Sequence, residues 1–256
     1  MIGAIKRGML HMIQFDALTK TYGAFHAVKP LSLTVRRGEV FGFLGPNGAG
    51  KTTTIRMMMG ILAPSAGRVL IDGLDCHLDA TEVKRRVGYL PDNPIFYDFL
   101  RGREILQFVA EMHGYPKAEA SERAAHLLKE LGLDEVTEEF AVNYSMGMKK
   151  KLGLACALIH EPTVLILDEP INGLDPRAAR DVQERLLAAA AQGTTIFVST
   201  HLLDMAEKLC DRVGIIHRGA LAATGTLDEI RASASADGSL EELFLKITDD
   251  SGEMAQ

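Results

Sequence analysis

The segment Gly45-Pro46-Asn47-Gly48-Ala49-Gly50-Lys51-Thr52 decides the fold of this chain, because it matches the P-loop pattern G-x-x-x-x-G-K-[ST]. The apolar run 40–44 before it predicts a buried strand, and residues 53–59 after it predict the first turns of a helix. Its glycines let the backbone curl so that consecutive N–H groups face phosphate oxygens, and the helix adds the positive end of its dipole. The segment therefore predicts a site for the phosphates of a nucleoside triphosphate.

Two side chains of this segment have separate predicted tasks. Lys51 is expected to neutralise charge on the β- and γ-phosphates, and the Thr52 hydroxyl is expected to ligate Mg²⁺. The alternative is a glycine-rich turn that binds nothing, but such turns rarely also carry Gly-Lys-Thr at this offset. The predicted phosphate-binding residues are Gly45, Pro46, Asn47, Gly48, Ala49, Gly50, Lys51, Thr52 and Thr53.

A second motif consists of four apolar residues, 164–167, followed by Asp168 and Glu169. This is the form expected of a buried central strand that carries acids at its carboxyl end. Asp168 is predicted to hold Mg²⁺, and Glu169 is predicted to polarise the attacking water as general base. A strand that merely ends in solvated acids is the alternative, and the P-loop in the same chain argues against it.

The composition sets broad limits on function. With 256 residues and 47% hydrophobic content, the chain can bury a substantial core. Its net charge of −6 argues against nucleic acid as the main partner, because no basic stripe is present to displace counterions. The one dense basic run, Lys149-Lys150-Lys151, is expected to be a solvated helix face.

The cysteines and the apolar runs indicate the cellular compartment expected for this chain. Its three cysteines are far apart and suggest neither a zinc site nor a disulfide framework, so a reducing compartment is expected. No window approaches the roughly 20 apolar residues needed to cross a bilayer. Any role at a membrane is therefore expected to come through a partner. Residues 1–11 differ from the pattern that begins at Met12 and are predicted to be an N-terminal extension.

Strand and helix patterns alternate along the chain, which predicts an α/β fold. Strand-like runs occur at residues 13–18, 31–35, 40–44, 69–71, 164–167, 195–198, 213–216 and 221–224. Between about 92 and 160 the strand signal disappears, and stretches such as 103–113 and 118–131 are helical in pattern, as is 177–191. A small, polar linker after Ile230 precedes an amphipathic segment at 240–247.

Several motifs together resemble the ATP-binding-cassette (ABC) ATPases, from Met12 to about Thr248. They are the P-loop, Asp168-Glu169, Tyr144-Ser145-Met146-Gly147-Met148, Asn172-Gly173-Leu174-Asp175 and Ser199-Thr200-His201. The resemblance implies that 144–148 is the signature loop, that Asp175 belongs to the D-loop, and that His201 is the switch histidine that contacts the γ-phosphate. It also implies that Tyr22 stacks on adenine.

The same resemblance implies the architecture. It is a P-loop NTPase core with a mixed sheet, an antiparallel β subdomain and an inserted helical subdomain at about 92–160, in one domain over 12–235. Residues 236–256 would form a short helical tail. Residues 149–159 have helical periodicity and, at about 1.5 Å per residue, would hold Ser145 some 15 Å from the strand that ends at Asp168. In the family, the Ser145 and Gly147 positions of one subunit close over the ATP held by the other, which implies a head-to-tail homodimer or paired ATPase subunits.

Four positions in three motifs depart from the family pattern. Met146 and Met148 replace a glycine and a glutamine of the commonest signature, and Ile171 replaces a usual threonine or serine. Asp92 stands where the family commonly has the Q-loop glutamine, and we expect this shorter, anionic side chain to reach Mg²⁺ through water. Asn93 would take that role if the loop shifts by one residue.

The function implied by the resemblance is that of an ATP-hydrolysing subunit of an ABC transporter, paired with a separate transmembrane permease on the cytoplasmic face of the membrane. Details of the segments 172–176, 199–203 and 239–246 resemble ABC-2 type exporters. The alternative is a cytosolic ABC ATPase that acts on nucleic acid or ribosomes. Phe96, Tyr97 and Phe99 are predicted to dock the permease, the alternative being local core packing.

Overall fold

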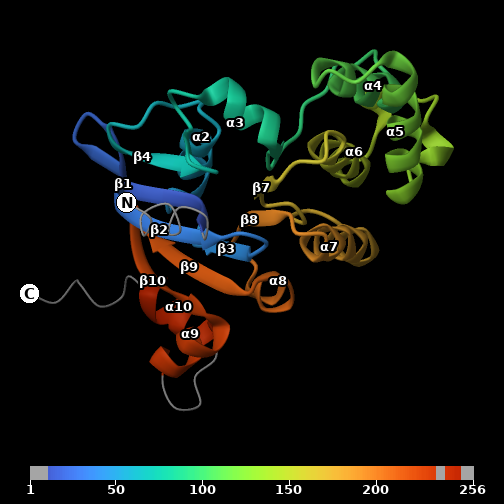
Figure 1. Cartoon of the computed structure of the whole chain (residues 1–256). Coiled ribbons are helices and arrows are strands. Elements are labelled where there is room, and N and C mark those ends of the chain that lie inside the picture. The colour runs from blue at the N-terminus through green and yellow to red at the C-terminus, as the bar shows by residue number, and fades with distance from the viewer. Residues whose placement is uncertain (1–10, 235–239, 249–256) are drawn as a thin grey trace, which may run out of the picture. The chain divides into compact units, whose positions relative to one another are not determined.

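The computed structural model describes residues 11–234 and 240–248, which form the α/β fold predicted from the sequence (Figure 1). The chain divides into a first unit, Met1–Val83 with Phe197–Gln256, and a second unit, Lys84–Ile196. The predicted extension over 1–11 lies outside the described residues except for residue 11, and only 240–248 of the predicted tail are described. The prediction of one domain over 12–235 stays a prediction.

The first unit contains the predicted antiparallel sheet. Its strands β1 (His11–Tyr22), β2 (Phe25–Arg36), β4 (Ala66–Ile71) and β5 (Leu74–Asp75) pair in the order β2-β1-β4-β5, with every pairing antiparallel. Apolar side chains of β1, such as Ile13 and Phe15, are buried. At the tip of the β1–β2 hairpin, beside the turn, Tyr22 pairs directly with Phe25, and both rings are exposed.

A second group of strands in the first unit leads to the P-loop. Strand β3 (Val40–Leu44) pairs in parallel with β9 (Arg212–His217), which pairs antiparallel with β10 (Ala220–Thr226). All five residues of β3 are buried. The strand on the other side of β3 is β8 (Thr195–Thr200), which enters this unit at Phe197. The Phe197 ring is fully buried, with its centroid 6.0 Å from that of Phe15, 5.8 Å from Phe41 and 5.4 Å from Phe43.

Helices complete the first unit. Helix α2 (Lys51–Met58) follows the P-loop, and α8 (Leu203–Leu209) packs against β3. Helix α9 (Leu227–Ala234) packs against β10 and against α10 (Leu240–Thr248), which corresponds to the predicted amphipathic segment. Helix α3 (Ala80–Arg86) spans the sequence boundary between the two units.

The second unit is mostly helical, as predicted. Helices α4 (Gly102–Met112) and α5 (Lys117–Glu130), green in Figure 1, pack together, and α6 (Met146–Leu158) contacts both. The short 3-10 helices η1 (Asp134–Val136) and η2 (Ala141–Asn143) connect α5 to α6, and α7 (Pro176–Ala191) follows later. Two parallel strands, β6 (Val87–Leu90) and β7 (Val164–Asp168), also belong to this unit. Strand β6 has no counterpart among the predicted strands.

Candidate nucleotide-binding site

The P-loop lies between β3 and α2, as predicted. Gly45 N donates to Thr200 O over 3.3 Å, and Ala49 N donates to Pro46 O over 3.2 Å. A Cβ on Gly45 would lie 2.4 Å from Ile216 O, and a Cβ on Gly50 would lie 2.7 Å from Ala27 O. Gly50 also has φ of +111°, in the left-handed region. A side chain at either position is therefore excluded by neighbouring backbone. Steric exclusion thus requires glycine at both positions, in addition to the predicted role of these residues in phosphate binding.

Lys51 lies folded over this loop. Its ammonium donates to Gly45 O at 2.6 Å and to Pro46 O at 3.2 Å, and the residue is 6% exposed. Within helix α2, the first turn has no acidic residue and no side-chain cap, and the exposed Thr52 lies in that turn. A buried cation beside an uncapped helix N-terminus suits a polyphosphate, so these residues fit ATP.

Two other predicted residues belong to the same unit. The main-chain bond between Gly45 and Thr200 places His201, the next residue after β8, beside the start of the P-loop. The close approach of Ala27 to Gly50 joins the β1–β2 hairpin to the loop, and Tyr22 is 52% exposed at the tip of this hairpin. Lys20 Nζ lies 5.2 Å from the centre of the Tyr22 ring. The first unit therefore carries the P-loop, His201 and Tyr22 on connected elements.

The second unit carries the predicted acids. Strand β7 is buried throughout and ends at Asp168, which is 2% exposed, and Glu169 after it is 6% exposed. Glu169 has φ of +48°, in the left-handed region that non-glycine residues rarely adopt. Two adjacent buried carboxylates, one on a strained backbone, are common at functional sites.

Lys150 links these acids to the predicted Q-loop residue. Its Nζ donates to Glu169 O at 2.5 Å and lies 3.4 Å from Asp92 Oδ1, while Asn93 Nδ2 lies 3.4 Å from Asp92 Oδ2. Burial lowers the pKa of Lys150, and the Asp92 carboxylate opposes this shift. The structure thus brings Asp92, Asn93 and Glu169 together through a lysine that the sequence did not single out.

The expected solvated face at Lys149–Lys151 is wrong for Lys150, which is 1% exposed. Lys151 is also half-buried and forms an ion pair with Asp181 at 2.9 Å. The missed signal is helical spacing, because Lys150 lies three and four residues before Gly153 and Leu154, which are buried on α6. A lysine on an apolar helix face requires buried acceptors, and here Glu169 O and Asp92 supply them.

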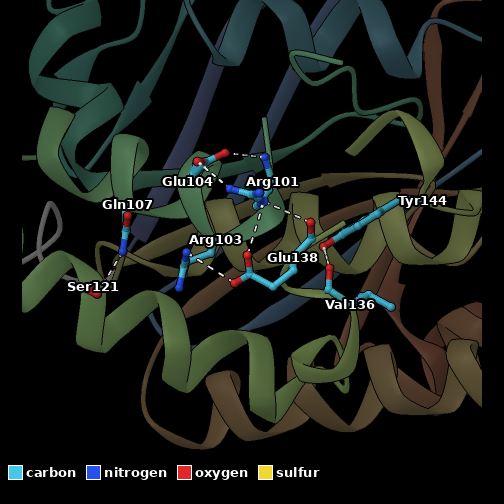
Figure 2. A network of polar contacts seen from close by, with 8 residues as sticks. All are labelled: Arg101, Arg103, Glu104, Gln107, Ser121, Val136, Glu138 and Tyr144. Carbon is cyan, nitrogen blue, oxygen red and sulfur yellow. Dashed lines mark hydrogen bonds and ion pairs between the residues drawn. The ribbon is translucent and has the colours of Figure 1, made fainter. Parts of the chain in front are cut away.

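The signature loop is shaped by capping and by a nearby polar network. Ser145 is the N-cap of α6, and its Oγ accepts a hydrogen bond from Met148 N at 3.2 Å. The preceding Tyr144 is buried, and its hydroxyl donates to Val136 O at 3.0 Å (Figure 2). In the same network, Arg101 Nε donates a hydrogen bond to the main-chain oxygen of Glu138 at 3.0 Å. The Glu138 carboxylate also forms an ion pair with Arg103 at 3.4 Å. These contacts hold the chain that leads into the loop.

Packing within the chain does not account for a glycine at position 147, whereas helix capping accounts for an aspartate at position 175. A Cβ on Gly147 would meet Leu174 Cδ2 only at 3.6 Å, an ordinary contact, so packing within this chain does not require glycine there. Asp175 is the N-cap of α7, and its Oδ1 accepts hydrogen bonds from Arg177 N and Ala178 N, both at 3.0 Å. The hydrogen bond from Ala178 N is the main cause that lowers the Asp175 pKa. Its contact with nucleotide stays a prediction.

A strand, glycine loop and helix with a buried lysine, together with a strand that ends in two buried acids, define a P-loop nucleoside triphosphatase. The ABC transporter family model matches residues 28–172 of this chain. The chain belongs to the ABC transporter family, and the predicted class of ABC ATPase is confirmed.

Known proteins support this assignment. The "Probable multidrug ABC transporter ATP-binding protein YbhF" of Escherichia coli (strain K12) is 35% identical over 93% of this chain and 42% of its own length. The "Bacitracin transport ATP-binding protein BcrA" of Bacillus licheniformis is 40% identical over 87% of this chain and 72% of its own length. A solved "ATP binding subunit of ABC transporter" has 36% identity and a TM-score of 0.86, and covers 92% of this chain and 99% of that one. The chain therefore spans less than half of YbhF and most of BcrA.

Proposed function

We propose that the chain is the ATP-hydrolysing subunit of an ABC transporter and that Glu169 is its general base. The observation that carries the proposal is the buried pair at the end of β7, Asp168 followed by Glu169, in a chain of a P-loop family. Lys51 and the loop N–H groups would hold the phosphates, and Glu169 would accept a proton from the attacking water. His201 would contact the γ-phosphate.

Mg²⁺ belongs to this proposal. Thr52 in the first turn of α2 and Asp168 at the end of β7 have the hard oxygen ligands that Mg²⁺ prefers, with Asp92 contributing through water. When bound, the ion would offset the negative charge that develops on the phosphates. The residues of the chain would then orient the water and the phosphates.

Replacement of Glu169 by glutamine tests the base role. The amide cannot accept the proton, but the P-loop contacts remain, so Glu169→Gln should bind ATP normally and lose about 100-fold or more of the hydrolysis rate. Hydrolysis by purified protein and ATP affinity by fluorescence titration are the measurements. Hydrolysis within about threefold of wild type would remove Glu169 from this role.

We also propose that two ATP-binding subunits pair head to tail. The openness of Gly147, which no contact within its own chain requires, supports a surface that a second molecule approaches closely. Ser145 and Gly147 would then cover the phosphates bound by the other subunit, and hydrolysis would reopen the pair. Glu169→Gln protein with ATP should elute as a dimer in size-exclusion chromatography, whereas the same protein without nucleotide should elute as a monomer.

The partner is proposed to be a separate permease of the exporter type, with this chain on its cytoplasmic side. Along the residues that the structure describes, no helix is both long and apolar enough to cross a bilayer. A cavity of about 570 Å³ in the second unit is lined by exposed aromatic side chains and would receive a helix of the permease. Its lining residues are Tyr97, Asp98, Phe99, Leu100 and Phe108. The names of YbhF, a probable multidrug transporter protein, and of BcrA, a bacitracin transport protein, support transport of antibiotic-like molecules.

A further inference from the structure

Lys150 is a buried cation with two specific acceptors. It lies one turn into α6, five residues after Ser145, and only 1% of the residue is exposed. A buried ammonium is costly unless acceptors surround it, so its contacts fix its position closely. Those acceptors are the main-chain oxygen of Glu169 and the carboxylate of Asp92.

Each acceptor lies at a point that matters for hydrolysis. The Glu169 carbonyl belongs to a residue in the left-handed conformation, directly after the buried Asp168. A hydrogen bond to that carbonyl limits rotation of the peptide that follows Glu169, and thereby the direction of the Glu169 side chain. Asp92 follows β6, is 40% exposed at its side chain, and without Lys150 would add an uncompensated negative charge close to Glu169.

We infer that Lys150 is a positioning residue for ATP hydrolysis: it holds the main chain of Glu169 in its productive conformation and neutralises Asp92 within the same site. One side chain thereby connects the helix that begins at the signature loop with the general base and with the Q-loop position. The inference rests on the proposed role of Glu169 as base. It explains how an aspartate is tolerated at position 92, because a cation at position 150 accompanies it.

The first test compares Lys150→Met with Lys149→Met. Methionine fills a similar volume without charge or donor, and Lys149 is the next residue of the same helix, half-buried, with its Nζ near Val142 O at 3.5 Å. Lys150→Met should lower kcat about tenfold or more and leave the ATP dissociation constant within about threefold, since the P-loop is untouched. Lys149→Met should stay within about twofold of wild type in both. Thermal unfolding of each variant shows that the fold is retained.

A double-mutant cycle with Asp92→Asn tests the coupling. Asp92→Asn should lower kcat in the native background, whereas in the Lys150→Met background it should lower kcat less or raise it, because there it removes a negative charge that has lost its partner. Equal effects of Asp92→Asn in both backgrounds would overturn the inference. So would a folded Lys150→Met protein that hydrolyses ATP at the wild-type rate.

Two further outcomes remain separable. If Lys150→Met does not fold, Lys150→Gln retains a donor for the Glu169 carbonyl and takes its place; loss of fold there as well would make Lys150 structural and overturn the inference. If Glu169→Gln hydrolyses ATP normally, the proposed base is wrong. If Glu169→Gln is inactive and a folded Lys150 variant is fully active, the base stands and only the positioning role of Lys150 fails.

Discussion

The rings of His113 and His160 stack in the second unit, with their centroids 3.7 Å apart and their planes 12° from parallel. His160 Nε2 lies 3.2 Å from Val87 O, so α4, β6 and the segment after α6 meet at this pair. Burial, followed by the nearby His113, lowers the pKa of His160 from 6.5 to about 4. Burial also lowers the pKa of His113. Both side chains are therefore neutral in the folded protein at pH 7.

This stacking predicts acid sensitivity of the fold. Below the unfolded pKa of about 6.5, the unfolded chain binds a proton at His160 that the folded chain does not bind. The free energy of unfolding should therefore decrease as the pH falls from about 6.5 towards 4. Urea denaturation at several pH values measures this slope. His160→Gln should flatten it, because the group that binds the extra proton in the unfolded chain is then absent. An unchanged slope in His160→Gln would contradict the assignment.

Removal of the P-loop lysine should affect binding before chemistry. Lys51→Ala deletes the charge that would offset the phosphates, so we expect ATP affinity to fall about 100-fold or more. Equilibrium binding of a fluorescent ATP analogue measures this affinity. The control is Lys29→Ala, because Lys29 is a lysine of β2 whose main-chain N–H donates a hydrogen bond to Gly219 O. An unchanged affinity in Lys51→Ala would place the phosphates elsewhere.

The residue that fills the Q-loop role can be identified by ranking two neighbours. Asp92→Ala removes a partner of Lys150 and a predicted water-mediated contact with Mg²⁺, so it should lower the hydrolysis rate and raise the Mg²⁺ concentration needed for half-maximal activity. Asn93→Ala loses only a 3.4 Å contact with Asp92 and should change both quantities little. Titration of hydrolysis with Mg²⁺ makes the comparison. The reverse ranking would mean that the loop functions one residue later.

The aromatic cavity predicts a separation of membrane binding from hydrolysis. Tyr97 and Phe99 are 72% and 81% exposed, so replacing both by alanine should leave folding and basal hydrolysis nearly intact. Binding to membranes that contain the permease should decrease about tenfold or more, because aromatic anchors supply much of the energy at such surfaces. Met112→Ala is the control, since Met112 is 71% exposed on α4 outside the cavity lining. Normal sedimentation of the double variant with these membranes would refute the docking role.

The stability of the first unit should depend on Phe197. This ring is fully buried and contacts three other phenylalanines, so Phe197→Ala should lower the free energy of unfolding by about 3–5 kcal/mol. Leu78→Ala removes a side chain that is 80% exposed and should change it by less than about 0.5 kcal/mol. Urea denaturation followed by circular dichroism measures both. A loss below about 1 kcal/mol in Phe197→Ala would show that the core closes around the cavity.

The sequence was sufficient to predict those elements that a single local pattern determines. The P-loop, β7 with its acids, and helices α4, α5 and α7 are at the predicted positions. Strand β6 was missed because it has only four residues, one of them glycine, and owes its conformation to pairing with β7. Phe96 is half-buried, whereas Phe108, which the sequence did not suggest, lines the aromatic cavity. These features depend on contacts between segments that are distant in the chain, and no single window contains them.

The pairing of Tyr22 with Phe25 at the tip of the β1–β2 hairpin limits how this protein can vary in evolution. Strand residues alternate between faces, so adding or deleting one residue in this hairpin would turn the Tyr22 ring to the opposite face of the ladder. The proposed platform for the base of ATP would be lost although no residue of the P-loop had changed. Natural variants should therefore exchange the side chain of Ala24 freely but keep glycine at position 23, whose φ is +58°, while insertions and deletions at this turn are selected against.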